Sequence, residues 1–176
     1  MTVQGVLARA AAAALAAAMG LTSLCCGRPS DESAIRGLLQ KAVSLAEKRD
    51  VEGLMAFFAP DYRDFQGRDG DSTRRLVTDY IERYRGIVIH LLGTRVGEIG
   101  PDGTASAEFE LALSHGAAEV LRKLIRVAGE YYHFRVELRR DGPGAWRFTA
   151  AEWEAADLSG LFPESLEILR KLFPGL

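Results

Sequence analysis

The sequence predicts an α+β fold with helices first, antiparallel strands next and one helix at the end. Between residues 31 and 84, apolar side chains recur three and four residues apart, which indicates amphipathic helices. From residue 87 the apolar period changes to two, which indicates strands with one buried face. Helices segregated from hairpin-connected strands favour α+β over a parallel βαβ arrangement. We expect N-terminal helices packed on one strongly curved antiparallel sheet, plus a C-terminal helix.

Length and composition indicate one globular domain. The chain has 176 residues, of which 48% are hydrophobic and 26% charged, so it is too apolar for disorder. The net charge is −2 and no basic stripe is present. The electrostatic signature of a nucleic-acid-binding protein is therefore missing, and we expect no nucleic acid partner.

Residues 1–26 have the pattern of an export signal. Arg9 is the only charged side chain before Arg28, and the run from Ala10 to Leu24 is apolar and rich in small residues. One positive charge ahead of a short apolar segment is typical of a secretory signal. The run is short for a bilayer span, although a helix kept as a membrane anchor is the alternative.

The two cysteines, Cys25 and Cys26, lie at the end of this segment. Their position resembles the acylated cysteine of a bacterial lipoprotein signal, with Cys26 the better acceptor because Cys25 before it is smaller than Leu24. The match departs from the usual motif, which has a small residue before the cysteine and leucine three before it; here Ser23 takes the third place. We expect a lipid anchor at the cell envelope, on the periplasmic side of a membrane. Plain secretion after an Ala-x-Ala cleavage is the alternative.

The helical part begins after a short tether at residues 27–32. Ser30 or Asp31 can cap a first helix, and Asp50 a second that is expected to run through Phe58 and end at Pro60. A loop is expected to follow as far as Asp71. The buried faces of the first and third helices are predicted to comprise Ile35, Leu38, Leu39, Ala42, Val43 and Ala46, and Leu76, Val77, Tyr80, Ile81 and Tyr84.

The remaining elements are about four strands and a final helix. Strands are expected over residues 87–99, with an interruption at Gly93, and over residues 104–114, 130–140 and 145–155. Residues 115–129 fit either a short helix or a strand. The outward faces of two strands are predicted to carry Glu108, Glu110, His133, Arg135, Glu137 and Arg139, as a solvated or dimeric sheet face with cross-strand ion pairs.

Two stretches carry a resemblance to a known family. The segments "RDVEGLMAFFAPDY" and "AWRFTAAEW", in this order of elements, resemble the nuclear transport factor 2-like superfamily, including SnoaL-like and ketosteroid-isomerase-like proteins. The resemblance covers Ser30 to Ala156. It implies a cone in residues 33–157 that encloses a pocket, often in homodimers packed sheet to sheet. Residues 158–176 extend this pattern, as a lid over the mouth of the cone or as an interface.

Two residues are candidates for catalysis. Glu152 would point into the cone if the last strand runs without interruption, and burial would then raise its pKa into the range of a general base. A β-bulge near Ala150 and Ala151 would instead turn Trp153 inward and Glu152 to solvent. His90 lies on a strand with two apolar faces, so alternation does not decide its side. A core or interface histidine is the alternative to a proton shuttle.

The residues expected to line the pocket are aromatic: Tyr62, Phe65, Tyr80, Tyr84, Tyr132 and Trp153. Aromatic walls with a few hydroxyl groups are typical of small-molecule sites, and plain core packing is the alternative. The three histidines lack the spacing of a zinc site, so no metal or cofactor is expected.

We therefore expect an exported, lipid-anchored domain that binds a small apolar ligand or a partner without catalysis. The alternative is an isomerase, dehydratase or hydrolase. Within the resembling superfamily, enzymes use a pocket Asp or His as base, but no residue here matches those positions.

Overall fold

The structure is a computed structural model that describes residues 30–84, 86–114 and 130–173. The predictions for the export signal, for Cys25 and Cys26, and for residues 27–29 of the tether fall outside these residues; residues 31 and 32, assigned to the tether, belong to the first helix. The same holds for the helix or strand expected within residues 115–129. No helix in the described part of the chain is both long enough and apolar enough to cross a bilayer.

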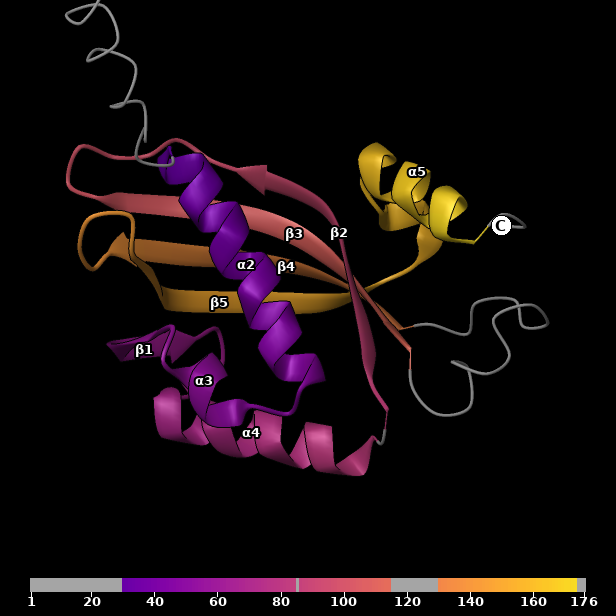
Figure 1. Cartoon of the computed structure of the whole chain (residues 1–176), viewed down its shortest axis with the longest axis horizontal. Coiled ribbons are helices and arrows are strands. Elements are labelled where there is room, and N and C mark those ends of the chain that lie inside the picture. The colour runs from indigo at the N-terminus through magenta and orange to yellow at the C-terminus, as the bar shows by residue number, and fades with distance from the viewer. Residues whose placement is uncertain (1–29, 85, 115–129, 174–176) are drawn as a thin grey trace, which may run out of the picture.

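The described residues form helices on both sides of one sheet (Figure 1). The helices are α2 (Asp31–Glu47), α3 (Val51–Met55), α4 (Gly70–Arg83) and α5 (Pro163–Leu172), with a short 3-10 helix η2 (Leu158–Gly160). The strands are β1 (Phe58–Asp64), β2 (Val88–Val96), β3 (Thr104–Ser114), β4 (Glu130–Arg140) and β5 (Trp146–Ala156). The predicted α+β class is therefore confirmed.

The five strands form an open sheet in the order β1-β5-β4-β3-β2. Strands β2 to β5 pair antiparallel as neighbours in sequence, whereas β1 pairs parallel with β5. In Figure 1, α2 crosses one face of the sheet, and α3 and α4 lie beside β1. We call this the inner face. Helix α5 lies at one end of the sheet in Figure 1 and packs beside β2, where Leu169 joins a cluster with Leu92 and Ala112 on the opposite, outer face.

Strand β1 corrects the prediction of a helix through Phe58 followed by a loop. Helix α3, capped by the Asp50 side chain on the Gly53 N–H, already ends at Met55. Phe58 to Asp64 then extend along β5, with the Phe148 N–H donating to the Phe57 carbonyl. Pro60 is tolerated because β1 lies at the sheet edge, where one side of the strand needs no partner.

Two irregularities in the sheet decide which side chains face inward. In β5, Ala150 pairs with Glu137 and Phe148 with the adjacent Leu138, so Thr149 is an extra residue. This is the β-bulge considered as an alternative above, and it reverses the alternation after Phe148. In β2 the register shifts between Leu91 and Thr94, around the predicted interruption at Gly93.

The main core lies between α2 and the inner face. Its buried members include Ile35, Leu38 and Leu39 from α2, and Phe109, Val136, Leu138, Trp146 and Phe148 from the sheet. Side chains of this kind contribute about 1.5–3 kcal/mol each when fully buried. This core fills the part of the inner face near the start of α2 and leaves the part near its end less filled.

Candidate ligand-binding site

A cavity of about 460 Å³ lies between the sheet and the helices α2 and α4. Its volume is within the range of small-molecule sites. Helix α2 contributes Leu39, Ala42, Val43 and Ala46, the continuation of the helix face that builds the core. Ala42 and Ala46 lie on the same face of α2 as Ile35 and Leu39, two turns further along the helix. These small side chains leave the volume open, and sequence reasoning assigned them only to the core.

Four of the six predicted pocket residues line this cavity: Tyr62, Tyr80, Tyr132 and Trp153. The other two lie beside it. Phe65 is 52% exposed and meets the Trp153 ring edge-on, with the ring centres 4.9 Å apart. Tyr84 lies against Tyr80, with ring centres 4.7 Å apart. Phe65 and Tyr84 therefore pack against Trp153 and Tyr80, which line the cavity, but do not line it themselves.

The buried end of the cavity holds two hydroxyl groups. Tyr62 on β1 is 1% exposed, and burial together with the Asp64 carboxylate raises the pKa of its phenol to about 12. Thr73, in the first turn of α4, is 4% exposed, and its hydroxyl partly offsets that shift. Among the described residues, no partner lies within full hydrogen-bond geometry of Thr73 Oγ1, so its contact with the Tyr62 phenol is a loose one. Sequence reasoning missed Thr73, because a threonine near a helix start reads as a capping residue.

The other end of the cavity is half-buried and carries two further tyrosines. The hydroxyls of Tyr80 and Tyr132 both donate to Oε2 of Glu130, at 3.2 and 3.0 Å. Burial first, and the Glu130 carboxylate next, raise the pKa of Tyr80. The pKa of Tyr132 is raised by burial and by its bond to Glu130. Both phenols therefore stay protonated near neutral pH, and each donates its one O–H to Glu130.

The two catalytic candidates lie outside the cavity. Because of the bulge in β5, Glu152 points to the outer face, where it accepts a hydrogen bond from Arg135 at 2.6 Å. His90 also lies away from the cavity wall, with its ring 5.7 Å from that of Phe173 beyond α5. Neither residue is in reach of a ligand in the cavity.

The described residues that line the cavity include no Asp, Glu, His, Lys, Arg or Cys. Its polar groups are hydroxyls, chiefly those of Tyr62, Thr73, Tyr80 and Tyr132. In the same part of the chain, no three or more His, Cys, Asp and Glu side chains are placed to hold a metal ion. The described residues of the wall therefore offer a bound molecule apolar contact and hydrogen bonding.

The outer face corrects the prediction that Glu110 is solvated. Glu110 is 0% exposed, and both of its carboxylate oxygens accept from the Phe162 N–H at 3.0 Å. His133 Nδ1 lies 3.5 Å from Glu110 Oε1. Glu108, two residues earlier on the same face, is paired with Arg135 as predicted. The C-terminal segment around α5 thus covers one end of this face and does not cover the cavity.

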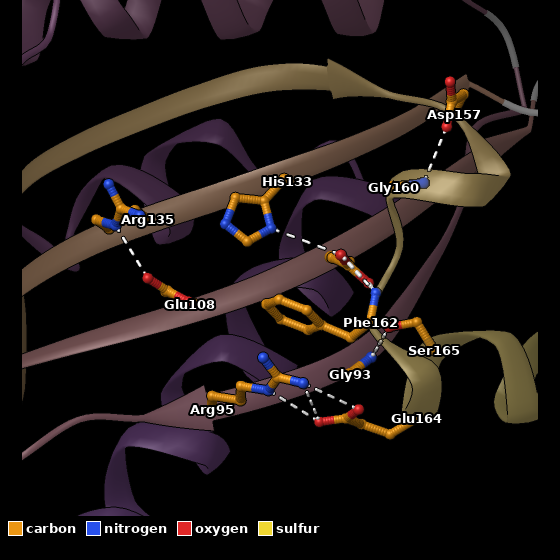
Figure 2. Close-up of polar contacts among 11 residues, drawn as sticks. Gly93, Arg95, Glu108, His133, Arg135, Asp157, Gly160, Phe162, Glu164 and Ser165 are labelled. Carbon is orange, nitrogen blue, oxygen red and sulfur yellow. Dashed lines mark hydrogen bonds and ion pairs between the residues drawn. The ribbon is translucent and has the colours of Figure 1, made fainter.

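The C-terminal segment can pack on the sheet because α5 approaches the backbone of β2 closely at Gly93. The Gly93 N–H donates to Ser165 Oγ at 2.7 Å, and a Cβ at Gly93 would lie only 2.6 Å from that atom. The Phe162 ring is held between the His133 ring edge and the Arg95 guanidinium, whose carbon lies 3.7 Å from the ring centre. Figure 2 shows these contacts side by side. The homodimer expected through the sheet face stays a prediction.

Comparison with known proteins identifies the fold. No family model matches the chain, and no curated protein is similar to it in sequence. An NTF2-like protein of unknown function from Pseudomonas putida KT2440 superimposes with a TM-score of 0.60 and 21% identity, over 75% of this chain and 96% of that one. An NTF-2 like protein of unknown function from Pseudomonas aeruginosa, PA1314, gives 0.58 and 19%, over 70% and 99%.

A longer protein shares the same fold in part. Bdellovibrio bacteriovorus Bd1075 superimposes with a TM-score of 0.57 and 11% identity, and the match spans 70% of this chain but only 40% of Bd1075. At such identities the similarity concerns fold alone. The chain has the NTF2-like fold, as the resemblance in its sequence predicted.

Proposed function

We propose that this chain is a non-catalytic domain that binds a small, uncharged, apolar ligand in the cavity between α2, α4 and the sheet. The observation that carries the proposal is the composition of the wall, which is apolar apart from hydroxyl groups. The cavity has a volume of about 460 Å³, which accommodates a molecule of two to three fused rings or an alkyl chain of similar volume.

The charge of a ligand decides how well it fits this cavity. A carboxylate or an ammonium group taken into this cavity would lose its hydration and find no oppositely charged side chain among the described residues of the wall. Apolar surface, by contrast, gains about 25 cal/mol for each Å² removed from water. The cavity therefore favours uncharged ligands over charged ones of the same shape.

The composition of the same wall supports the non-catalytic part of the proposal. A general base for an isomerase or a dehydratase needs a pKa near the working pH and a position within hydrogen-bond reach of the substrate. The pKa values of Tyr62, Tyr80 and Tyr132 are all raised from an already high value. Glu152 and His90 are outside the cavity, so the described residues of the wall supply hydroxyl groups and include no carboxylate or imidazole.

A fluorescent pair with matched ring skeletons tests this proposal. N-phenyl-1-naphthylamine is uncharged, and 1-anilinonaphthalene-8-sulfonate is the same molecule with an added sulfonate. We expect the uncharged dye to bind with one-to-one stoichiometry and at least about tenfold more tightly than the sulfonate, because the buried anion lacks a partner. Failure of the uncharged dye to bind, or equal affinities, would contradict the proposal.

We further propose that the domain is exported and held at the cell envelope by a lipid on Cys26. The support is the sequence of residues 1–26, with one charge at Arg9 ahead of an apolar run that ends at two cysteines. An envelope location fits a domain that takes up an apolar ligand, because such molecules partition into membranes.

Expression of the full chain in a bacterium tests the anchor. We expect the wild type in the membrane fraction with acyl mass on Cys26, and release of the Cys26→Ser variant into the soluble fraction. Cys25→Ser is the matched control and is expected to remain anchored. A mature chain without acyl mass, beginning before or beyond both cysteines in mass spectrometry, would rule out the lipid.

A further inference from the structure

We propose that the buried end of the cavity is a polar subsite, formed by the hydroxyls of Thr73 and Tyr62, that selects apolar ligands carrying an alcohol or a ketone. This inference rests on the proposed binding function and goes further by naming the chemical class of the ligand.

The unpaired hydroxyl of Thr73 is the main observation. Thr73 is 4% exposed and lines the cavity, yet among the described residues no partner lies within full hydrogen-bond geometry of its Oγ1, and the Tyr62 phenol reaches it only loosely. A buried polar group without a partner destabilises the folded protein, and such groups are uncommon in native structures. A ligand that supplies the missing hydrogen bond recovers this free energy on binding.

Tyr62 adds a second hydroxyl at the same place. It lies on β1, 1% exposed, and lines the cavity beside Thr73, which belongs to α4. The two hydroxyls have two O–H donors in total. A contact between Thr73 and Tyr62 engages at most one of these donors. The other donor is left for an acceptor oxygen on the ligand. Both a carbonyl and an alcohol oxygen provide one, and an alcohol also donates in return.

An anionic ligand is disfavoured at this end. The nearest charges are Asp64 and Arg68, which pair through Arg68 Nε at 2.6 Å, so each charge is balanced by the other. Arg68 Nη2 is buried without a hydrogen-bond partner in the described part of the chain, and the guanidinium lies 5.2 Å from the Trp153 ring centre. Arg68 is absent from the cavity wall. A ligand carboxylate would therefore meet hydroxyls and aromatic rings.

Three naphthalenes that differ in one substituent test the subsite: 2-naphthol, 2-methylnaphthalene and 2-naphthoate, each measured by calorimetry with the protein titrated into the probe. The decisive quantity is the ratio of the affinities for 2-naphthol and 2-methylnaphthalene. In the Thr73→Val variant we expect this ratio to fall about tenfold, which corresponds to one lost hydrogen bond. Thr73→Ser keeps the hydroxyl and is expected to retain the ratio.

Thr78→Val is the matched control, because Thr78 is on the same helix but does not line the cavity. An unchanged ratio in Thr73→Val, or an equal fall in Thr78→Val, overturns the subsite. Tighter binding of 2-naphthoate than of 2-naphthol overturns it in favour of an anion site at Arg68. If none of the three probes binds while the variants remain folded, the proposed binding function itself fails, and the two failures are thereby distinguished.

Discussion

Replacement of Ala42 by phenylalanine is expected to abolish ligand binding while the protein stays folded. Ala42 lines the cavity from α2, and its methyl group faces a space of about 460 Å³. A phenyl ring placed there occupies volume that the ligand needs. We expect the affinity for N-phenyl-1-naphthylamine to fall about 100-fold or more, measured by fluorescence titration. Stability should change by less than about 1.5 kcal/mol, because the ring enters an existing cavity and displaces no packed side chain.

Gln40→Phe is the matched control for this variant. Gln40 lies on the same helix, but its side chain is exposed. The substitution adds the same ring to α2 outside the cavity, so the dye should bind as it does to the wild type. Full binding by the Ala42→Phe variant, with its fold confirmed by circular dichroism, would show that the dye occupies another surface.

Replacement of Glu110 by alanine is expected to release the C-terminal segment from the outer face. The Glu110 carboxylate is fully buried and holds the Phe162 N–H with both oxygens. Without it, this N–H loses its buried acceptor, and a small void remains. We expect a loss of about 3 kcal/mol in the free energy of unfolding in urea. Hydrogen exchange should rise first in residues 158–173.

Glu108→Ala is the control, since Glu108 stands two residues earlier on the same strand and face but belongs to a solvent-accessible ion pair with Arg135. Such pairs contribute about 0–1 kcal/mol. Glu110→Gln, which keeps an acceptor oxygen for the Phe162 N–H, is expected to lose less than Glu110→Ala. Equal losses for Glu108→Ala and Glu110→Ala would mean that the buried carboxylate does not hold the segment.

The periodicity of the sequence was sufficient to predict most of the secondary structure. The face Ile35, Leu38, Leu39 of α2 and the alternation of β3 and β4 appear as predicted, because each depends on local geometry and on one buried side. Strand β1 was missed for the opposite reason. Its residues Phe58 to Asp64 alternate poorly and contain Pro60, and only pairing with the distant β5 makes them a strand.

The candidate site was predicted less completely. Aromatic residues pointed correctly to Tyr62, Tyr80, Tyr132 and Trp153 as cavity walls. Whether Glu152 or Trp153 faces inward depended on one extra residue at Thr149, which alternation alone does not locate. The sequence pattern does not predict Thr73 as a cavity residue, because its role depends on its burial beside Tyr62, which belongs to another element.

By itself, the sequence determined the α+β class, the order of the helices and the antiparallel strands, and the side of the sheet on which Glu108 and Glu110 stand. These features follow from the spacing of apolar residues along one segment at a time. Only the tertiary structure decided that Glu110 is buried and Glu108 is not, that the cavity wall excludes Glu152 and His90, and that Thr73 meets Tyr62. Burial and charge neighbourhood depend on segments far apart in the chain, such as Phe162 over β3, and a local pattern does not contain that information.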